Sequence, residues 1–274
     1  MEKVRKALIA VLAVIFVVSL GGLLQTQMGY RQGEEAYSAA EELADAPQEV
    51  LPEPQAPNPP ESVQETELLP PMPDDPYIET LLEMDLEALQ AVNEDVLGWI
   101  QIPDMEISYP LVQGSDNDYY LNRTWQKKSS SVGSVYLDYR NSRELSDFNT
   151  IIYGHNMKND SMFGQLDLFH DEEFLKEHPY VYIVDERGCR KYQIFAAYDV
   201  SVSTAESYQL SFSGEEDRQT FVDTCLSLSY IDTGVVPTVN DPIITLSTCS
   251  GWGYSARWGV QAALIQEVPA ENRT

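Results

Sequence analysis

The carboxyl-terminal third of the chain contains two adjacent β-rich runs. They are Ile243-Ile-Thr-Leu-Ser-Thr-Cys249 and Ala256-Arg-Trp-Gly-Val-Gln-Ala-Ala-Leu-Ile-Gln266. A short glycine-containing loop, residues 250–254, lies between them. β-Branched and aromatic residues favour strands, and two strands joined by a short loop usually pair antiparallel. This pairing predicts that Arg257, near the start of the second run, lies close to Cys249 at the end of the first.

The part of the chain before these two runs shows the same pattern of short β-rich runs. Six further runs, cut by Pro, Gly or Asp, are predicted as strands: 99–103, 107–112, 132–137, 150–153, 180–184 and 192–202. Apolar residues at helical spacing predict an amphipathic helix over 76–92 and another over 215–228. About eight short strands with few helices predict a mainly β fold, a closed or nearly closed barrel. We assign this folded domain to residues 76–268 and a short tail to 269–274.

The amino-terminal region has a different character. Residues 7–24 form an apolar run of 18 residues, which as a helix rises about 27 Å, close to the hydrocarbon thickness of a bilayer. Lys3, Arg5 and Lys6 precede it, so residues 1–6 are expected in the cytoplasm and the remainder outside. A cleaved signal peptide is the alternative, but the residues after the run offer no A-x-A pattern. We therefore predict a single-pass membrane anchor.

Residues 25–75 are predicted to form an acidic, proline-rich extracellular stalk. Ten of the 16 prolines of the chain lie between Pro47 and Pro76. Proline fixes φ and lacks a backbone donor, so neither helix nor sheet is expected from Glu34 to Pro76. No Lys or Arg occurs between Arg31 and Arg123, and repulsion between the acidic charges extends the segment. Such a spacer would hold the domain on the order of 100 Å from the membrane.

The composition excludes several classes of function. With 17 Lys+Arg against 44 Asp+Glu, the net charge is −27, which argues against a nucleic-acid partner. Part of this acidity, 12 of the 44 acidic residues, lies in the predicted stalk and says little about the substrate. The three cysteines have no CxxC spacing, so neither a disulfide framework nor a zinc knuckle is expected. In the absence of recognisable cofactor motifs, we predict no organic cofactor and no metal.

Among the cysteines, Cys249 is the candidate nucleophile. It stands where a strand meets a polar loop, and a cation such as Arg257 favours the thiolate and can stabilise an oxyanion. The plain alternative for a cysteine is a small buried hydrophobe. Cys225, on the apolar face of its predicted helix, fits that alternative. Cys189, in the predicted turn 186–189, is expected to be an incidental exposed thiol.

The chain has three histidines, and His155 is the candidate acid/base. It follows the predicted strand 150–153 and opens a polar loop, the position from which a strand delivers a side chain to a site. His170 and His178 lie in the acidic segment 169–179 and are predicted to be solvated. Their spacing does not suit a shared metal site.

Several motifs, in order along the chain, resemble those of sortases, the cysteine transpeptidases that anchor surface proteins. The run Thr245–Cys249 followed by Arg257 resembles the sortase signature, and Thr150–Met157 resembles the sortase histidine motif. Four further segments and one helix resemble class B sortases in particular. They are residues 93–103, 116–121, 133–141 and 161–166 and the helix 215–228, which is inserted before the cysteine strand. The resemblance covers residues 76–266, and the order of anchor, stalk and exported barrel matches the usual organisation of the family.

The resemblance implies a role for each site residue. Cys249 would be the nucleophile, His155 the general acid/base, and Arg257 the cation that positions the substrate and stabilises the oxyanion. Substrate contacts would come from Asn117, Leu121, Thr204, Tyr208, Ser247 and Thr248, although each of these residues could equally be structural.

The resemblance also implies a reaction. The thiolate would attack a carbonyl within the C-terminal sorting motif of a surface protein, NPxTx-like or [S/N]PxTG-like. A peptidoglycan amine would then resolve the thioacyl enzyme.

Three alternatives remain open from the sequence. The first is a Cys–His peptidase that releases the acyl group to water, and the second is a pilin-polymerising sortase that uses a pilin lysine as the amine. The third is a non-catalytic surface binding module. The loop 250–254 carries two glycines and two aromatic residues where class B sortases vary, so the sorting motif also remains open.

Overall fold

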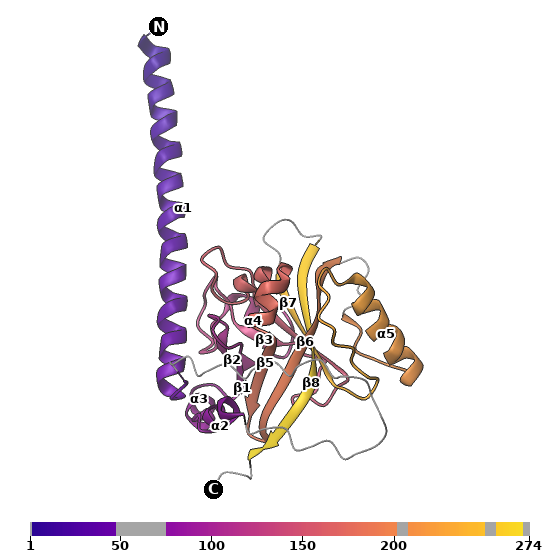
Figure 1. Cartoon of the computed structure of the whole chain (residues 1–274). Coiled ribbons are helices and arrows are strands. Elements are labelled where there is room, and N and C mark those ends of the chain that lie inside the picture. Colours follow the sequence, from indigo (N-terminus) through magenta and orange to yellow (C-terminus); the bar gives the residue numbers. More distant parts are fainter. Residues whose placement is uncertain (1, 48–74, 202–207, 250–255, 271–274) are drawn as a thin grey trace, which may run out of the picture.

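The structure is a computed structural model that describes residues 2–47, 75–201, 208–249 and 256–270. In these parts of the chain, eight strands form one closed barrel in the order β1-β2-β3-β4-β7-β8-β6-β5 (Figure 1). The strands are β1 (Val96–Gln101), β2 (Ser108–Val112), β3 (Val135–Leu137), β4 (Asn149–His155), β5 (Tyr180–Asp185), β6 (Gly188–Ser201), β7 (Ile243–Cys249) and β8 (Ala256–Pro269). The predicted mainly β barrel of about eight strands is confirmed.

Most neighbouring strands in the barrel pair antiparallel, but β2 with β3 and β4 with β7 pair parallel. Apolar and aromatic side chains of the strands and of the segments packed against them form a buried core. The largest fully buried side chains include Trp99, Trp125, Tyr182, Tyr192 and Phe163. This packed barrel gives the strand ends a rigid support.

The helices surround the barrel. They are α1 (Glu2–Leu43), α2 (Pro76–Leu82), α3 (Leu86–Val92), α4 (Glu172–Glu177) and α5 (Glu215–Leu228), with short 3-10 helices η1 (Tyr120–Asn122) and η2 (Gly164–His170). Helix α5 has the predicted bounds and precedes β7, the strand that ends at Cys249.

The prediction of one continuous helix over 76–92 is wrong. The chain breaks between α2 and α3, where the carboxylate of Asp85 accepts a hydrogen bond from the backbone N–H of Ala88 at 3.0 Å. An aspartate in this position satisfies a free N–H group and starts a new helix. Asp75 caps α2 in the same way by accepting from the N–H of Tyr77.

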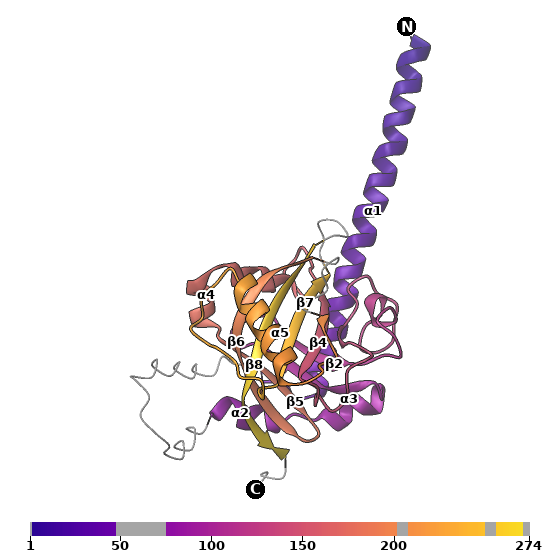
Figure 2. The ribbon, with the colours of Figure 1, turned by 90° about the vertical axis from the view of Figure 1, so that its right-hand side faces the viewer.

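The predicted spacer is also wrong in its first part, because α1 continues through Leu43. Residues 34–46 are rich in Ala and Glu, which are strong helix formers, and the prolines begin only at Pro47. The last turns of α1 lie against the domain, where Ala40 and Ala44 are fully buried. Its amino-terminal half projects away from the barrel (Figure 2).

Both flanks of segment 48–74 lie on the same domain. The carbonyl oxygen of Ala44 accepts a hydrogen bond from the N–H of Asp85 at 2.9 Å. Asp75 is buried, and its carboxylate accepts from Tyr182 and Lys191 of the barrel at 2.9 and 2.8 Å. Segment 48–74 itself lies outside the described residues. Its anchored ends show that it does not separate α1 from the domain, so the spacing of 100 Å is not supported.

Candidate active site

Three strands bring the candidate catalytic residues to one end of the barrel. In the parallel ladder of β4 and β7, His155 is the register partner of Cys249. Strand β8 pairs antiparallel with β7, as predicted, with Ser247 opposite Gly259. The next residues also meet, since the N–H of Trp258 donates to Oγ1 of Thr248 at 3.2 Å, and this contact brings Arg257 to the end of β7. The backbone therefore gathers His155, Cys249 and Arg257; the side chain of Cys249 lies outside the described parts of the structure.

The imidazole of His155 is half-buried and held by the backbone. Its Nε2 lies 2.6 Å from the carbonyl oxygen of Leu121, in η1. A carbonyl oxygen can only accept, so Nε2 carries the hydrogen. Consequently Nδ1 is the ring nitrogen that remains to exchange a proton.

A glycine makes room for this ring. Gly133 has a φ of +66°, and a Cβ there would lie 2.6 Å from the Leu121 oxygen and 2.8 Å from Cδ2 of His155. Any side chain at position 133 would therefore displace the histidine or the carbonyl that holds it. The sequence motif that begins at Gly133 marks this position, but its contact with His155 arises only in the fold.

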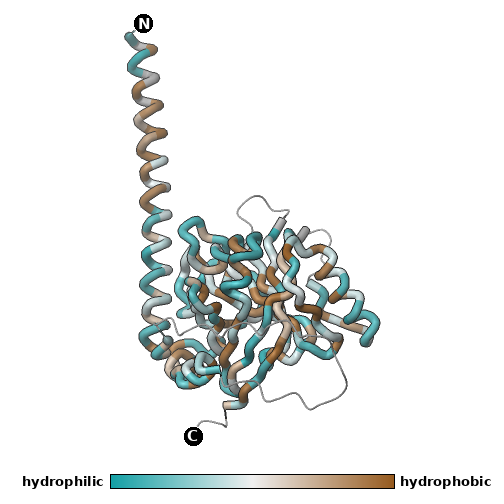
Figure 3. The backbone as a smooth tube through the Cα atoms, in the orientation of Figure 1, coloured by the Kyte–Doolittle hydropathy of each residue, from teal (hydrophilic) through white to brown (hydrophobic). Residues whose placement is uncertain are grey.

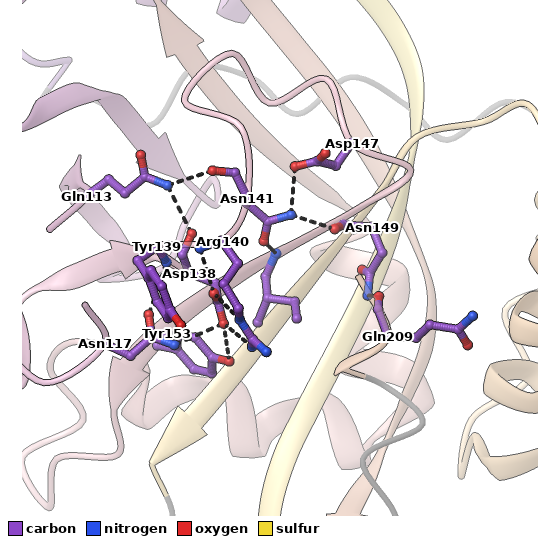
Figure 4. A network of polar contacts seen from close by, with 11 residues as sticks. Gln113, Asn117, Asp138, Tyr139, Arg140, Asn141, Asp147, Asn149, Tyr153 and Gln209 are labelled. Atoms are coloured by element: carbon purple, nitrogen blue, oxygen red, sulfur yellow. Dashed lines mark hydrogen bonds and ion pairs between the residues drawn. The ribbon is translucent and has the colours of Figure 1, made fainter. Parts of the chain in front are cut away.

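Arg257 is half-buried and lies near an aromatic ring. Its guanidinium carbon is 5.9 Å from the centre of the Tyr153 ring, within the range of a cation–π interaction. The Tyr153 hydroxyl donates to the carboxylate of Asp138 at 3.0 Å (Figure 4). Sequence reasoning assigned no role to Asp138 or Tyr153, whose importance depends on their contacts.

Asp138 is a fully buried carboxylate at the centre of this network (Figure 4). It accepts hydrogen bonds from Nε and Nη2 of Arg140, at 2.9 and 2.7 Å, and from Asn117 at 2.9 Å. Burial alone would raise the pKa of Asp138, but the bonds from Arg140, Asn117 and Tyr153 outweigh it and lower the pKa. Asp138 is therefore an anion at neutral pH.

Asn117 uses both ends of its amide within the protein. Its Nδ2 donates to Asp138, and its Oδ1 accepts from the N–H of Tyr139 at 3.0 Å. These bonds hold the turn that follows β3. The structure thus gives Asn117 a structural task, and its expected contact with substrate stays a prediction.

The structure describes three of the remaining residues that were predicted to contact substrate, Tyr208, Ser247 and Thr248. The Tyr208 hydroxyl lies 2.7 Å from Oγ of Ser247, and the Tyr208 ring stacks on Tyr153 with centroids 6.2 Å apart. Ser247 and Thr248 are fully buried, and Oγ1 of Thr248 accepts from the N–H of Trp258 at 3.2 Å. Thr204 lies outside the described residues.

The other histidines and cysteines have different surroundings. His170 is exposed, as predicted, but its ring stacks on Trp258 with centroids 3.6 Å apart. His178 is half-buried and so is less solvated than predicted, and its Nδ1 lies 3.1 Å from the carbonyl oxygen of Pro103. Cys225 is buried, as predicted.

The prediction of an exposed Cys189 is wrong. Cys189 pairs with Val184 inside the β5–β6 ladder and is fully buried. Gly188 takes the turn, so the cysteine already belongs to the strand. Burial raises the pKa of Cys189 to about 12, which keeps it an unreactive thiol at neutral pH.

The closed eight-stranded barrel places a histidine and a cysteine side by side at the ends of two parallel strands, an arrangement suited to a β-barrel cysteine enzyme. Comparison with known proteins agrees: residues 100–265, more than half of the chain, match the model of the sortase domain. The chain belongs to the sortase family of cysteine transpeptidases, and its similarity to sortase B proteins places it in class B.

Three relatives illustrate the similarity. Sortase B of Listeria monocytogenes serovar 1/2a is 41% identical over 170 residues, which cover 60% of this chain and 67% of the relative. The crystal structure of Bacillus anthracis sortase B in complex with AAEK1 matches with a TM-score of 0.68 and 28% identity, over 87% of this chain and 99% of that one. A Staphylococcus aureus sortase B–substrate complex matches with a TM-score of 0.63 and 31% identity, over 66% and 84%.

Proposed function

We propose that the protein is a membrane-anchored transpeptidase that cleaves a C-terminal sorting motif of surface proteins and transfers the acyl group to a peptidoglycan amine. One observation carries this proposal: His155 and Cys249 are register partners at one end of the barrel, with Arg257 on the adjoining strand. No other described element joins a histidine and a cysteine in this way.

In the proposed reaction, Nδ1 of His155 takes the proton of the Cys249 thiol, and the thiolate attacks a backbone carbonyl carbon of the motif. The carbonyl oxygen becomes an oxyanion, which the Arg257 guanidinium stabilises. When the C–N bond breaks, Nδ1 of His155 gives a proton to the departing amine, leaving a thioacyl enzyme. His155 then takes a proton from the incoming amine, whose nitrogen displaces the thiolate and completes a new amide.

The substrate proposal is a peptide of the NPxTx or [S/N]PxTG type. Support comes from the related S. aureus structure, which is described as a substrate complex. Among the proposed groove residues, Leu121 and Tyr208 are half-buried and accessible for contact. Ser247 and Thr248 are buried, so we propose that they act by holding the backbone of β7. Asn117 and Thr204 complete the proposed set.

We further propose that residues 7–24 span the membrane, with residues 1–6 in the cytoplasm and the catalytic domain outside. Helix α1 is long and apolar enough to cross a membrane, and its most apolar stretch is not buried in the protein. Its projecting half is mostly hydrophobic, and the half beside the barrel is mainly hydrophilic (Figure 3). Because α1 is continuous, the anchor joins the domain without a flexible spacer.

The proposed orientation places the catalytic end close to the membrane. The end of β7 and the start of β8 lie toward the amino terminus of α1, and the chain's carboxyl terminus lies opposite (Figures 1 and 2). From Leu24 to Gly33, α1 rises roughly 14 Å. Gly33 lies against Val132, and the residue after Val132 is Gly133, which lies against the His155 ring. This supports substrates that are presented near the membrane surface.

The test uses the full-length chain in nanodiscs. It is incubated with NPxTx- and SPxTG-like peptides, with and without triglycine or diaminopimelate, and the products are identified by mass spectrometry. We expect a thioacyl adduct on Cys249 that amine converts to a ligated product. Cys249→Ala should form no adduct, whereas the matched control Cys225→Ala should.

Other outcomes separate the alternatives. If added amine leaves hydrolysis unchanged, the protein is a peptidase that releases to water. If only a lysine-bearing pilin accepts the acyl group, polymerisation is the function. If no peptide forms an adduct and Cys249 also resists alkylation in the folded protein, the transpeptidase proposal fails and a binding module is favoured.

A further inference from the structure

Helix α1 approaches the wall of the histidine site closely. A Cβ on Gly29 would lie 2.6 Å from Oγ of Ser131, and one on Gly33 would lie 2.7 Å from Cγ2 of Val132. The helix backbone can reach segment 131–134 only because these two positions, one turn apart, carry no side chain.

Two buried hydrogen bonds then fasten the helix to this wall. The Tyr37 hydroxyl donates to the carbonyl oxygen of Gly133. One residue earlier on the helix, the carbonyl oxygen of Ala36 accepts from Nε1 of Trp125 at 2.8 Å. Burial raises the pKa of Tyr37, so its hydroxyl stays protonated and remains a donor.

The contacts continue from Gly133 to the candidate catalytic histidine. The next residue, Ser134, donates from its N–H to the Tyr120 carbonyl at 3.0 Å and from its hydroxyl to the Arg123 carbonyl at 2.7 Å. In the sequence, Leu121 lies between Tyr120 and Arg123, and its carbonyl oxygen accepts a hydrogen bond from Nε2 of His155. Gly133 and the turn 120–123 therefore form one unit around the imidazole.

We propose that Tyr37 is a positioning residue for His155. By holding Gly133, the helix that follows the membrane segment holds the Leu121 carbonyl, and this carbonyl sets the orientation and tautomer of the ring. The inference rests on the proposed role of His155. It makes residues 29–46 a part of the active-site support rather than a tether.

The test is Tyr37→Phe in the full-length chain in nanodiscs, which removes one hydroxyl and keeps the ring. We expect kcat to fall about fivefold, because a hydrogen bond of this kind contributes about 1 kcal/mol. The KM for the NPxTx- or SPxTG-like peptide that the wild type turns over should stay within about twofold. Tyr30→Phe, which removes a hydroxyl from the same helix about two turns before Tyr37, is the matched control.

A spectroscopic measurement does not depend on turnover. The protein has three histidines, so the ring nitrogen resonances of His155 can be assigned by their loss in His155→Ala. Tyr37→Phe should shift the Nε2 and Nδ1 resonances of His155 and leave those of His170 and His178 in place. Gly33→Ala, which pushes α1 from Val132, should cause a similar shift. Thermal unfolding shows whether each variant is folded.

The outcomes distinguish the two proposals. If Tyr37→Phe is folded and keeps both the wild-type kcat and the His155 resonances, the positioning role is overturned. Equal losses in Tyr37→Phe and Tyr30→Phe would also overturn it, since general helix packing would then be the cause. If His155→Ala turns over as fast as the wild type, the proposed function fails, whereas the resonances still report on Tyr37.

Discussion

His155 and Cys249 are the last register partners of the parallel ladder between β4 and β7. Parallel strands need a long crossover, and here β5, β6 and α5 all lie between them in the chain. Both residues stand at the ends of strands that are paired on both sides, since β3 flanks β4 and β8 flanks β7. Their backbone separation is thus set by a hydrogen-bonded sheet rather than by a flexible loop.

Arg257→Ala is expected to lower kcat by about 10²–10³, because it removes the donor that we propose for the oxyanion. Arg257→Lys keeps the charge but loses the planar fork that can donate two hydrogen bonds, so an intermediate loss is expected. Steady-state kinetics with a sorting peptide measure both. The exposed Arg143→Ala is the control, and a similar loss there would refute a specific role for Arg257.

Asp138→Asn is expected to lower the free energy of unfolding at pH 7 by about 2 kcal/mol, because hydrogen bonds to a charged group are lost. The pKa of Asp138 is lowered in the folded state, so the stability it contributes is present above the unfolded pKa of about 3.9 and is lost as pH falls through the folded value. Urea unfolding at pH 7 and pH 3 measures the change.

The difference between wild type and Asp138→Asn should therefore narrow below pH 4. Tyr153→Phe removes only one of the donors to Asp138, so it should lower the free energy of unfolding at pH 7 by less than Asp138→Asn does. A difference that does not change with pH would show that the charge of Asp138 is not what stabilises the network.

Lys191→Met is expected to destabilise the domain by about 3 kcal/mol, because it leaves the buried carboxylate of Asp75 without its cation. The double variant Asp75→Asn with Lys191→Met should recover part of this loss. Chemical denaturation of the two single variants and the double variant gives the coupling. If the losses simply add, the ion pair does not hold α2 to the barrel.

Replacing residues 48–74 with a ten-residue Gly/Ser linker should preserve both the melting temperature and the activity. Pro47 and Tyr77 border the same cavity of about 650 Å³, so the two ends of the segment are close. Turnover of a substrate held in the same membrane measures activity. If the segment were a spacer between anchor and domain, this replacement would abolish turnover of the membrane-held substrate but not of a free peptide.

Iodoacetamide should label the native protein at Cys249 alone. Cys189 and Cys225 are buried, and burial raises the pKa of Cys189 to about 12. Peptide mass spectrometry before and after unfolding in guanidinium identifies the sites. Labelling of Cys189 in the folded protein at a rate like that of Cys249 would contradict its place in the β5–β6 ladder.

Local patterns in the sequence were enough to predict most elements. The β-rich runs correspond to the eight strands, and α5 has the predicted bounds. The apolar spacing does not predict the helix break at Asp85 because it continues across the break, whereas the cap depends on one hydrogen bond to the backbone. The sequence predicts a turn at Cys189, whereas the change from turn to strand at Gly188 is decided by the pairing of β6 with β5.

The sequence by itself determined the barrel class, the apolar amino-terminal helix and the three residues proposed for catalysis. It could do so because strand and helix propensities are local and because cysteine and histidine are rare in this chain. Only the tertiary structure decided that β4 lies beside β7, that the buried Asp138 accepts a hydrogen bond from Tyr153, and that α1 touches the wall of the His155 site. These relationships join residues that are distant in the chain, and the packing that brings such residues together leaves no periodic signal in the sequence.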